Sequence, residues 1–198
     1  MEISTYKQIT TWAAELDGVF TLPDLKIAFN GISSPSIYRE IESLIEAKDL
    51  VRVKRGYYAT VNTKLSTIAA RLYPKSYIST GTALAAYRII GSVPERRVQV
   101  VGVGTPTITI CSLGTIEFLS IAPKLFFGFE RNENANWATA EKAYLDCCYY
   151  FYKGKTFSFD LTSDVNRTIL DPKKIERHLV VYDKRFITFF RNQFWRVK

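Results

Sequence analysis

Apolar residues in the first fifty positions recur at intervals of three and four, the spacing of one face of a helix. This pattern predicts helices over residues 5–16, 20–30 and 35–49. Residues 50–59 follow with two short runs of β-forming side chains around Gly56, which supplies the positive φ that a tight turn needs. The first sixty residues or so are therefore expected to form three helices and a β-hairpin.

Two of these helices have recognisable start signals. Thr21 is a candidate N-cap, with Pro23 in the first turn of the second helix. Ser34 before Pro35 repeats the combination of cap and proline at the start of the third helix. We therefore expect Ser34 to cap that helix.

The third helix has two distinct faces at 100° per residue. Its apolar face is formed by Ile37, Ile41, Leu44 and Ile45, and its polar face by Ser36, Arg39, Ser43 and Glu46. A small polar residue at the helix start, with Arg one turn later, suits a helix that enters the DNA major groove N-terminus first.

Three helices followed by a hairpin are the order of a winged helix. In that arrangement the third helix contacts base edges and the hairpin, or wing, contacts phosphate. We expect DNA contacts from two groups of residues. The recognition-helix group is Ser34, Ser36, Tyr38, Arg39 and Ser43, and the wing group is Lys54, Arg55 and Tyr57.

Two other interpretations of this region stay open, namely a winged helix used for protein contacts and a plain three-helix bundle with a hairpin. Glu40, Glu42 and Glu46 favour them, because carboxylates facing phosphate would repel DNA. Glu46 lies late on the polar face, so only the N-terminal turn of the helix would lie deep in a groove.

The remaining residues change repeatedly between helical and strand periods, which predicts an α+β fold. A winged-helix domain over 1–62 would precede a mixed α/β domain over 63–198. Helices are expected over 63–73, 79–91, 138–154, 171–180 and 183–195, the second of them capped by Ser79 or Thr80. Strands are expected over 96–103, 107–113 and 115–122 as an antiparallel meander, and over 124–130, followed by a polar loop over 132–137.

Residues with catalytic chemistry are sparse. The best acid–base candidates are Glu141, Lys142 and Asp146. A metal-dependent nuclease needs carboxylates on adjacent strands, whereas Glu141 and Lys142 are neighbours on a helix and point apart. Glu141 instead suits the helix dipole, and Asp146 can pair with Lys142 one turn earlier. His178 has no Cys or His at ligand spacing, so we expect no enzyme activity, metal or cofactor.

Charge is distributed unevenly along the chain, whose net charge is +8. Residues 1–62 carry seven Lys or Arg and eight Asp or Glu, whereas residues 63–198 carry twenty and eleven. A basic balance favours an anionic partner, with nucleic acid first. Because the first domain is slightly acidic, cations of the second domain must share the phosphate contacts.

The C-terminal segment interleaves cations with aromatic residues. The cations Lys184, Arg185, Arg191 and Arg196 are candidates for phosphate contacts. Basic and aromatic residues together are typical of nucleic-acid surfaces where bases stack. At helical spacing, however, aromatic residues more often form core, with the cations in solvent.

The cysteines indicate a reducing compartment. Cys147 and Cys148 would lie on different sides of a helix, which favours buried free thiols over a disulfide or metal site. We find no leader with a basic start and an apolar run, and no apolar run long enough to span a bilayer. We therefore expect a cytoplasmic protein without a membrane partner.

Three motifs in series resemble the AbiEi family, the antitoxins and transcriptional regulators of bacterial abortive-infection systems. The hairpin end "RGYY" is similar to the family's R-G-x-Y, and the segment from Tyr77 to Leu84 is similar to the opening of its second domain. "ATAEKAYLD", residues 138–146, is similar to its A-x-x-E-K-A-L-L-D helix. The chain departs from the family pattern at Tyr87–Arg88, where a His-Gly pair is common, and at Tyr144, where Leu is common.

The resemblance implies a transcriptional autorepressor that binds double-stranded DNA at its own promoter and acts as an antitoxin. It also implies functional pairing with a nucleotidyltransferase-like toxin, without direct binding between the two proteins. From the residues themselves, the alternative is a protein-interaction or RNA-binding module without antitoxin activity.

Overall fold

The structure is a computed structural model that describes residues 3–29, 33–91, 96–132 and 134–195. The chain divides into two compact units. The first contains Met1–Pro74 and Ile108–Ile116, and the second contains Lys75–Thr107 and Glu117–Lys198. The expected domain boundary at residue 62 lies inside the first unit, which also includes the helix over Leu65–Leu72.

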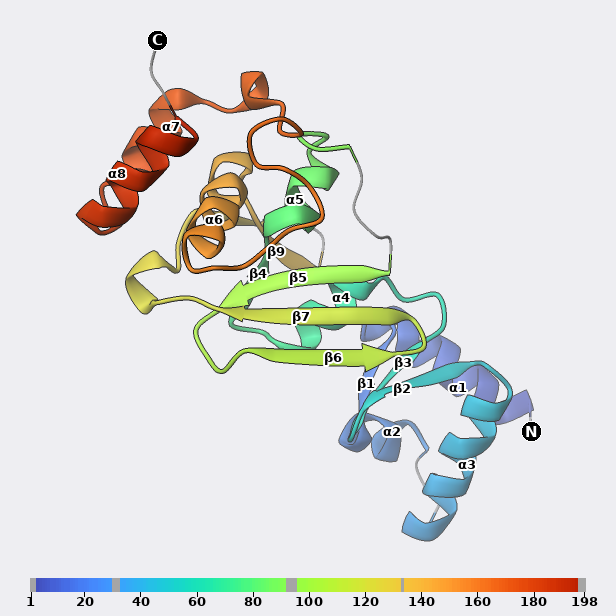
Figure 1. The fold of residues 1–198 in the computed structure, drawn as a ribbon. Helices are drawn as coiled ribbons and strands as arrows, with labels where there is room; N and C mark the ends of the chain where they lie inside the picture. The colour runs from blue at the N-terminus through green and yellow to red at the C-terminus, as the bar shows by residue number, and fades with distance from the viewer. Residues whose placement is uncertain (1–2, 30–32, 92–95, 133, 196–198) are drawn as a thin grey trace. The chain divides into compact units, whose positions relative to one another are not determined.

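Helices of the first unit surround a small sheet (Figure 1). Its elements are α1 (Ile3–Glu15), β1 (Val19–Thr21), α2 (Leu22–Ala28), α3 (Ser34–Glu46), β2 (Leu50–Lys54), β3 (Tyr57–Thr60) and α4 (Leu65–Leu72). The four helices and the hairpin confirm the sequence predictions. Strand β1 was not predicted, because three residues are too few to show a period of two.

The central strand of this sheet is β3, with the order β1-β3-β2. Both pairings are antiparallel, and Ala59 lies opposite Val19 on one side and Val51 on the other. Thr21 ends β1 and caps α2 through the expected hydrogen bond from the Asp24 amide, while the Asp24 carboxylate accepts from the Thr21 amide. This reciprocal cap fixes the direction in which α2 leaves the sheet.

The larger sheet is mixed, with the strand order β6-β7-β5-β4-β9-β8, and most of it belongs to the second unit. The elements from β4 to the C-terminus are β4 (Ser76–Ile78), α5 (Thr80–Ala86), β5 (Arg97–Gly102), β6 (Thr107–Cys111), β7 (Gly114–Ser120), η1 (Pro123–Leu125), β8 (Phe129–Asn132), β9 (Ala135–Ala138), α6 (Ala140–Tyr152), η2 (Arg167–Ile169), α7 (Pro172–Leu179) and α8 (Lys184–Gln193). The β6–β7 hairpin residues 108–116 are counted with the first unit. The chain is thus an α+β protein.

The predicted antiparallel meander is wrong in its strand order. β7, not β6, lies beside β5, and the arrows of β5 and β7 point the same way (Figure 1). All but the first residue of β5 is buried, so this strand needs a neighbour on each side, and β4 and β7 fill those positions. β6 is mostly exposed and forms an edge of the sheet.

Two other predictions in this unit are also wrong. The expected polar loop over 132–137 contains β9, which pairs with β8 and runs parallel to β4. The helix expected over 79–91 ends at Ala86, and Arg88 then has a φ of 57° in the left-handed region. β4 was not predicted either, because it has only three residues.

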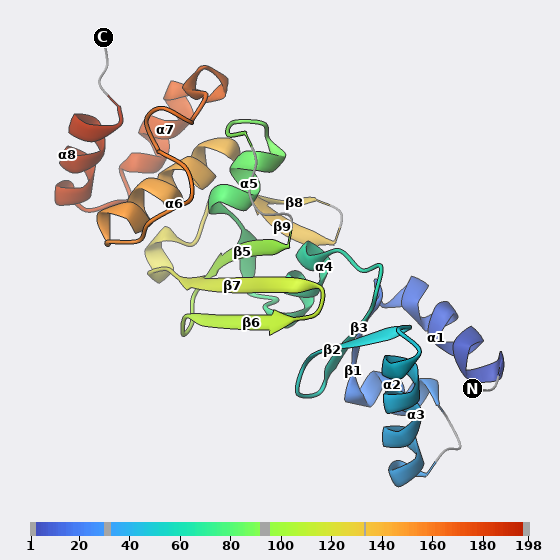
Figure 2. The same cartoon turned by 45° about the vertical axis from the view of Figure 1, so that its right-hand side comes forward.

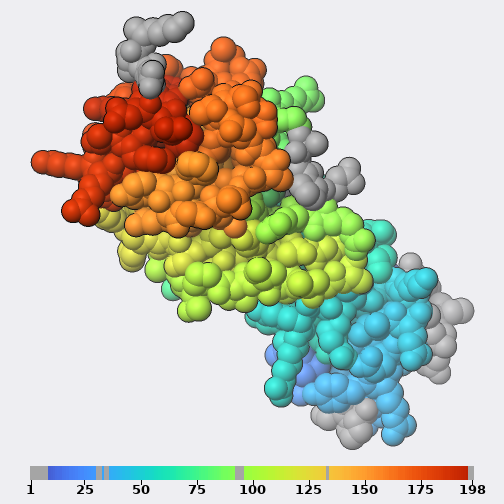
Figure 3. All heavy atoms as spheres, in the orientation of Figure 1, coloured from blue at the N-terminus to red at the C-terminus, as the bar shows by residue number. Residues whose placement is uncertain are grey.

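Helices α5 and α6 pack on each other and on the sheet, and α7 and α8 pack on α6 (Figure 2). On the face shown in Figure 3, the atoms of the C-terminal segment, in orange and red, lie against one another. Nine residues of α6 are buried, including Glu141, Lys142 and Asp146. A helix buried on so many sides holds charged groups in the middle of the core.

Candidate functional site

The exposed face of α3 matches the predicted polar arc in part, at Arg39 and Glu46, and also includes Tyr38 and Glu42. Ile37, Ile41 and Leu44 are buried in the core of the first unit, whereas Tyr38 is 48% exposed and Arg39 is also exposed. Ser36 and Ser43 are half-buried at the margins of this face. A shallow hollow on it is lined by Tyr38, Arg39, Glu42, Ser43 and Glu46.

The start of α3 differs from the prediction by one residue. The N-cap is Ser33 and not Ser34, which is the first residue of the helix, so Pro35 takes the second position. The Ser33 side chain makes no capping hydrogen bond, and its hydroxyl lies 2.9 Å from the Ser36 hydroxyl. The side chain of Ser34 lies outside the part of the chain that the structure describes.

The wing turns at Arg55 and Gly56, and of these only Gly56 has a positive φ, 78°. Arg55 is exposed at the turn. Lys54 is the last residue of β2, opposite Tyr57. Its ammonium lies 4.9 Å from the centre of the Tyr57 ring and 5.2 Å from that of Tyr73, close enough for cation–π attraction to both. The two wing cations therefore differ, because Lys54 is held by aromatic rings and Arg55 faces solvent.

One of the α3 carboxylates is neutralised within the first unit. Arg52 on β2 pairs with Glu42, and its guanidinium lies 5.8 Å from the centre of the Tyr58 ring. The hydrogen bond to Glu42 raises the pKa of Arg52 above its already high usual value. Sequence reasoning missed this pair, and no spacing rule finds it, because the two residues lie on different elements.

The cations of the C-terminal segment divide into three cases. Lys184 and Arg185 are exposed at the start of α8. Arg191 is exposed but forms an ion pair with Glu176 of α7 at 2.6 Å. Arg196 lies beyond the last described residue.

The aromatic residues between these cations form core. Phe186 and Phe190 are fully buried and Phe194 is nearly so. Their rings contact one another in tilted pairs and meet the rings of Tyr144 and Tyr149 of α6 edge-on. The buried rings are not available to nucleic-acid bases, which confirms the core interpretation of their helical spacing.

The three acid–base candidates of α6 are buried, and two of them form a network. The predicted ion pair between Lys142 and Asp146 is confirmed, and both side chains are 0% exposed. The Asp146 carboxylate also accepts hydrogen bonds from the Tyr77 hydroxyl at 3.0 Å and the Ser79 hydroxyl at 2.8 Å. Asp146 therefore has a partner on each oxygen, which a buried carboxylate requires.

Lys142 is surrounded by aromatic rings. Its ammonium lies 5.0 to 5.7 Å from the ring centres of Phe127, Tyr77 and Tyr182, and it donates to the Tyr182 hydroxyl at 3.2 Å. Burial lowers the pKa of Lys142, against the attraction of Asp146, which raises it. Burial also raises the pKa values of Tyr77 and Tyr182, next to Asp146, so both hydroxyls keep their protons at neutral pH.

The other candidates for chemistry have structural partners. Glu141 accepts a hydrogen bond from the Asp171 amide at 3.1 Å. The His178 ring lies 5.2 Å from the Phe127 ring, and burial and the nearby Lys142 lower the pKa of His178. Cys147 and Cys148 are buried free thiols, and burial raises both of their pKa values well above the usual one. Among the described residues, no group of three or more His, Cys, Asp or Glu is placed to hold a metal ion.

Sequence reasoning missed the partners of α6 on other elements. Ser79 was expected only as a cap of α5, yet its hydroxyl donates to Asp146 and makes no capping bond. Gln99 and Glu117 are also buried, on β5 and β7. A sequence signal existed for both, because each is a single polar residue within an apolar strand run, "VQVV" and "IEFL".

No described helix is long and apolar enough to cross a membrane. A scan against protein-family models finds no family that matches the chain, and a search of curated proteins finds no significant match. The polar face of α3, the wing and the buried α6 network are therefore the observations from which a function has to be inferred.

Proposed function

We propose that this protein is a DNA-binding transcriptional autorepressor that also serves as the antitoxin of a toxin–antitoxin pair. The observation that carries the DNA part is the exposed polar face of α3, with Tyr38 and Arg39 in solvent and the β2–β3 hairpin following in the same unit. The first unit would be a winged helix-turn-helix.

The order of elements supports this assignment. Helix, short strand, two helices and a hairpin, with the short strand added to the hairpin as a third strand, is the arrangement of a winged helix. In such a domain the third helix enters the major groove and the hairpin reaches the flanking backbone. The polar face of α3 is the face that would meet the bases.

Each residue of this surface has a distinct expected role. Arg39 would donate two hydrogen bonds to a guanine edge, with Ser36 and Tyr38 beside it. Arg55 would contact phosphate, because its side chain is exposed at the turn. Lys54 would contribute through its charge, with its ammonium kept near the rings of Tyr57 and Tyr73.

Acidic residues on α3 would repel DNA phosphate, and the Glu42–Arg52 pair reduces this repulsion. A carboxylate with an arginine beside it repels phosphate less than an isolated one. Glu46 lies at the last turn of α3, away from the N-terminal end that would lie deepest in the groove.

The antitoxin part rests on the motif resemblance. Residues 138–146 are similar to the family's helix motif, and the structure makes this segment the end of β9 and the start of α6. We propose a nucleotidyltransferase-like toxin as the functional partner, neutralised without direct binding. Rescue of growth when both proteins are co-expressed tests this part separately from DNA binding.

Binding to the DNA upstream of the protein's own gene tests the DNA part. We expect Arg39→Ala to weaken binding by about 1–3 kcal/mol and to relax sequence preference. Lys54→Ala with Arg55→Ala should weaken binding on all sequences and reduce the salt dependence.

Arg71→Ala is the matched control, because Arg71 is an exposed arginine of the same unit on α4. Gel-shift titrations at two salt concentrations measure all of these variants. Wild-type affinity in both the Arg39 variant and the wing variant would overturn the assignment. Retention of a protein or RNA in place of this DNA would favour an interaction module.

A further inference from the structure

The polar network of α6 continues through the core of the second unit. Thr80, next to Ser79, is fully buried and has a φ of 52°. A positive φ is a rare outlier for a β-branched residue and marks a conformation that the surrounding structure must enforce. The Thr80 hydroxyl lies 2.7 Å from Gln99 Oε1, to which it donates, and 2.8 Å from the Ser79 carbonyl.

Gln99 leads to a second cluster, around Glu117. This carboxylate is buried, at 6% exposure, and accepts from the Gln99 amide and the Arg97 guanidinium, both at 2.9 Å. Its other oxygen accepts from the Lys155 ammonium at 2.5 Å. Burial raises the pKa of Glu117, but the hydrogen bonds from Lys155, Gln99 and Arg97 lower it by more than burial raises it. The net pKa is therefore below the usual value, and the carboxylate stays ionised.

A hollow of about 100 Å³ lies over this cluster. Its walls come from α5, β5 and the segment after α6, and all of them belong to the second unit. The lining residues are Thr82, Arg97, Gln99, Lys155, Thr156, Phe157, Ser158 and Phe159. They include two cations and three hydroxyl groups, and no carboxylate.

Charge and donors favour an anion in this hollow. Arg97 and Lys155 share the single carboxylate of Glu117, which leaves a surplus of one positive charge. The Arg97 side chain is 47% exposed, and the hydrogen bond to Glu117 uses one of its five N–H donors. Three hydroxyls and a forked guanidinium are donors suited to a tetrahedral oxyanion.

Size permits a phosphoryl group. The hollow of about 100 Å³ is several times larger than the roughly 10–15 Å³ that one water molecule needs on the same measure. A phosphate monoester would bind through its phosphoryl end, because the cations and hydroxyls line the hollow.

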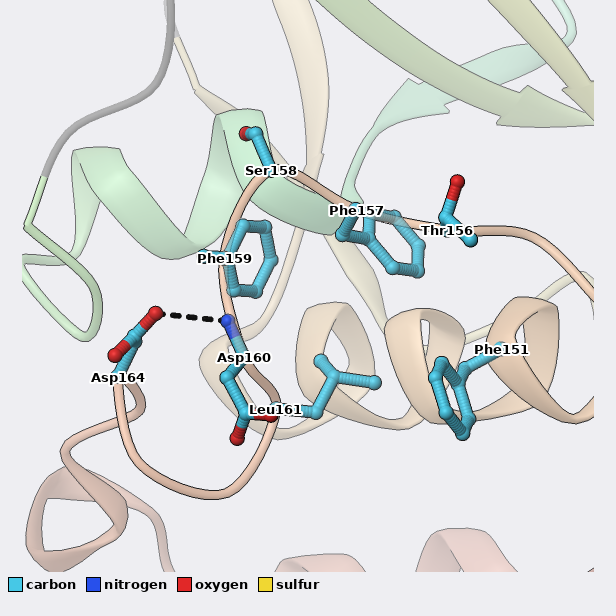
Figure 4. A pocket seen from close by; sticks show the side chains of 8 residues that line it. All are labelled: Phe151, Thr156, Phe157, Ser158, Phe159, Asp160, Leu161 and Asp164. Atoms are coloured by element: carbon cyan, nitrogen blue, oxygen red, sulfur yellow. Dashed lines mark hydrogen bonds between the residues drawn. The ribbon is translucent and has the colours of Figure 1, made fainter.

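One wall of the hollow is fixed by a hydrogen-bonded loop. Figure 4 shows this loop together with a second hollow, which is lined by Phe151 and the loop itself. The Asp160 carboxylate accepts from the amides of Thr162 and Ser163, and the Asp160 amide donates to Asp164 at 2.8 Å. In Figure 4, Ser158 lies at the crest of the loop with its hydroxyl directed away from α6.

We propose that the hollow bounded by Arg97, Lys155 and Ser158 is a binding site for the phosphoryl group of a small molecule. The ligand is either inorganic phosphate or a phosphate monoester such as a nucleoside monophosphate, since both present the same oxyanion. The site lies wholly within the second unit, and the proposal does not rest on DNA binding by the first.

Calorimetric titration of the full chain with inorganic phosphate, and separately with a nucleoside monophosphate, tests the proposal. We expect one site per chain for at least one of the two probes. Tighter binding of the monoester identifies an ester as the ligand, and equal or tighter binding of inorganic phosphate identifies the free ion.

Two variants locate the site. Ser158→Glu places a carboxylate at the rim without touching the Glu117 cluster, and we expect it to abolish binding while the thermal midpoint without phosphate stays unchanged. Arg97→Gln should weaken binding about tenfold or more, because a charged hydrogen bond is lost. Arg131→Gln is the control, because Arg131 is an exposed arginine on β8 and does not line the hollow.

Two results would overturn the proposal. One is no heat of binding for either probe at millimolar concentration with a folded wild-type chain. The other is equal binding in the wild type and in Ser158→Glu, which would mean that the anion binds elsewhere on a basic surface.

Discussion

The ammonium of Lys142 lies wholly inside the second unit, next to one carboxylate, one hydroxyl and three aromatic rings. Removing two ions from water is costly, and their attraction offsets this only when the remaining hydrogen bonds are also satisfied. Here Tyr77 and Ser79 satisfy the second oxygen of Asp146. The four side chains therefore satisfy one another, and removing any one of them should destabilise the fold.

The first prediction concerns this set. Lys142→Met should destabilise the protein by about 3–5 kcal/mol, because it leaves a buried carboxylate without its counter-ion. Adding Asp146→Asn should recover part of the loss, since the amide keeps an acceptor for Tyr77 and Ser79 without a charge. Urea unfolding of the two single variants and the double variant measures this, and purely additive losses would contradict it.

A second prediction concerns acid stability. Hydrogen bonds from Thr162 and Ser163 lower the pKa of Asp160 from 3.8 to about 2, and the partners of Glu117 lower its pKa as well. A carboxyl with a depressed pKa in the folded state stabilises that state above its unfolded pKa, and the stabilisation is lost as pH falls through the folded pKa. Unfolding free energy should therefore fall between about pH 4.5 and pH 2.

Asp160→Asn provides the comparison for the acid prediction. This variant should be less stable at neutral pH and should lose less stability on acidification, since one depressed carboxyl is gone. Urea midpoints at a series of pH values measure the slope. An unchanged slope in the variant would mean that the hydrogen bonds of the turn do not lower the pKa of Asp160.

At this scale the sequence predicted the partner of Asp146 but not its surroundings. A spacing of four on a helix is enough to place Lys142 and Asp146 side by side. Burial of the pair depends on Tyr77, Ser79 and Tyr182, which lie on other elements and far away in sequence. Local periodicity contains no information about such partners.

Among the elements, the helices were predicted and most of the short strands were not. α3, α6 and α8 have apolar residues at helical spacing over ten residues or more, α7 has the start signal of Asp171 and Pro172, and the structure confirms each of these helices. β1, β4 and β9 have three or four residues and are held by their neighbours in a sheet, so their own sequences show no pattern. The predicted strand order was wrong because the order depends on which strands flank the buried strand β5, and local sequence patterns do not show this.

The third prediction concerns the turn between η1 and β8. Gly128 has a φ of 73°, and a Cβ there would lie 3.1 Å from both Cβ and Cγ of Lys142. Gly128→Ala should therefore destabilise the second unit by about 1–3 kcal/mol through backbone strain and crowding. Gly91→Ala is the control, because a Cβ at Gly91 has no atom within 4 Å.

Urea unfolding of both glycine variants measures the difference. Equal midpoints for Gly128→Ala and Gly91→Ala would show that the turn adapts to a side chain without cost.

At the scale of the whole molecule, the two parts of the chain differ in net charge. Residues 1–62 are slightly acidic, and the surplus of Lys and Arg lies in residues 63–198. If the protein acts as a DNA-binding repressor, cations from residues 63–198 must supply part of the phosphate contacts. Lys184 and Arg185 are the exposed candidates at the start of α8, whereas Arg191 is paired with Glu176.

The fourth prediction follows from this division. Lys184→Ala with Arg185→Ala should lower the slope of log affinity against log salt by about 1.8, or 0.9 for each lost phosphate contact. Arg191→Ala should change it less, because its guanidinium already has a carboxylate partner. Filter-binding or fluorescence titrations across salt concentrations measure the slopes, and an unchanged slope in the double variant would assign these contacts to other cations.

The buried charges of α6 also have a consequence for how the chain folds. Tyr77 and Asp146 are 69 positions apart, so their contact forms only when distant segments meet. An intermediate in which α6 docks with another rotation would bury Lys142 or Asp146 without partners. Such intermediates have a high free energy and are therefore not populated. We expect α6 to dock in one cooperative step, with the native rotation selected by the buried network.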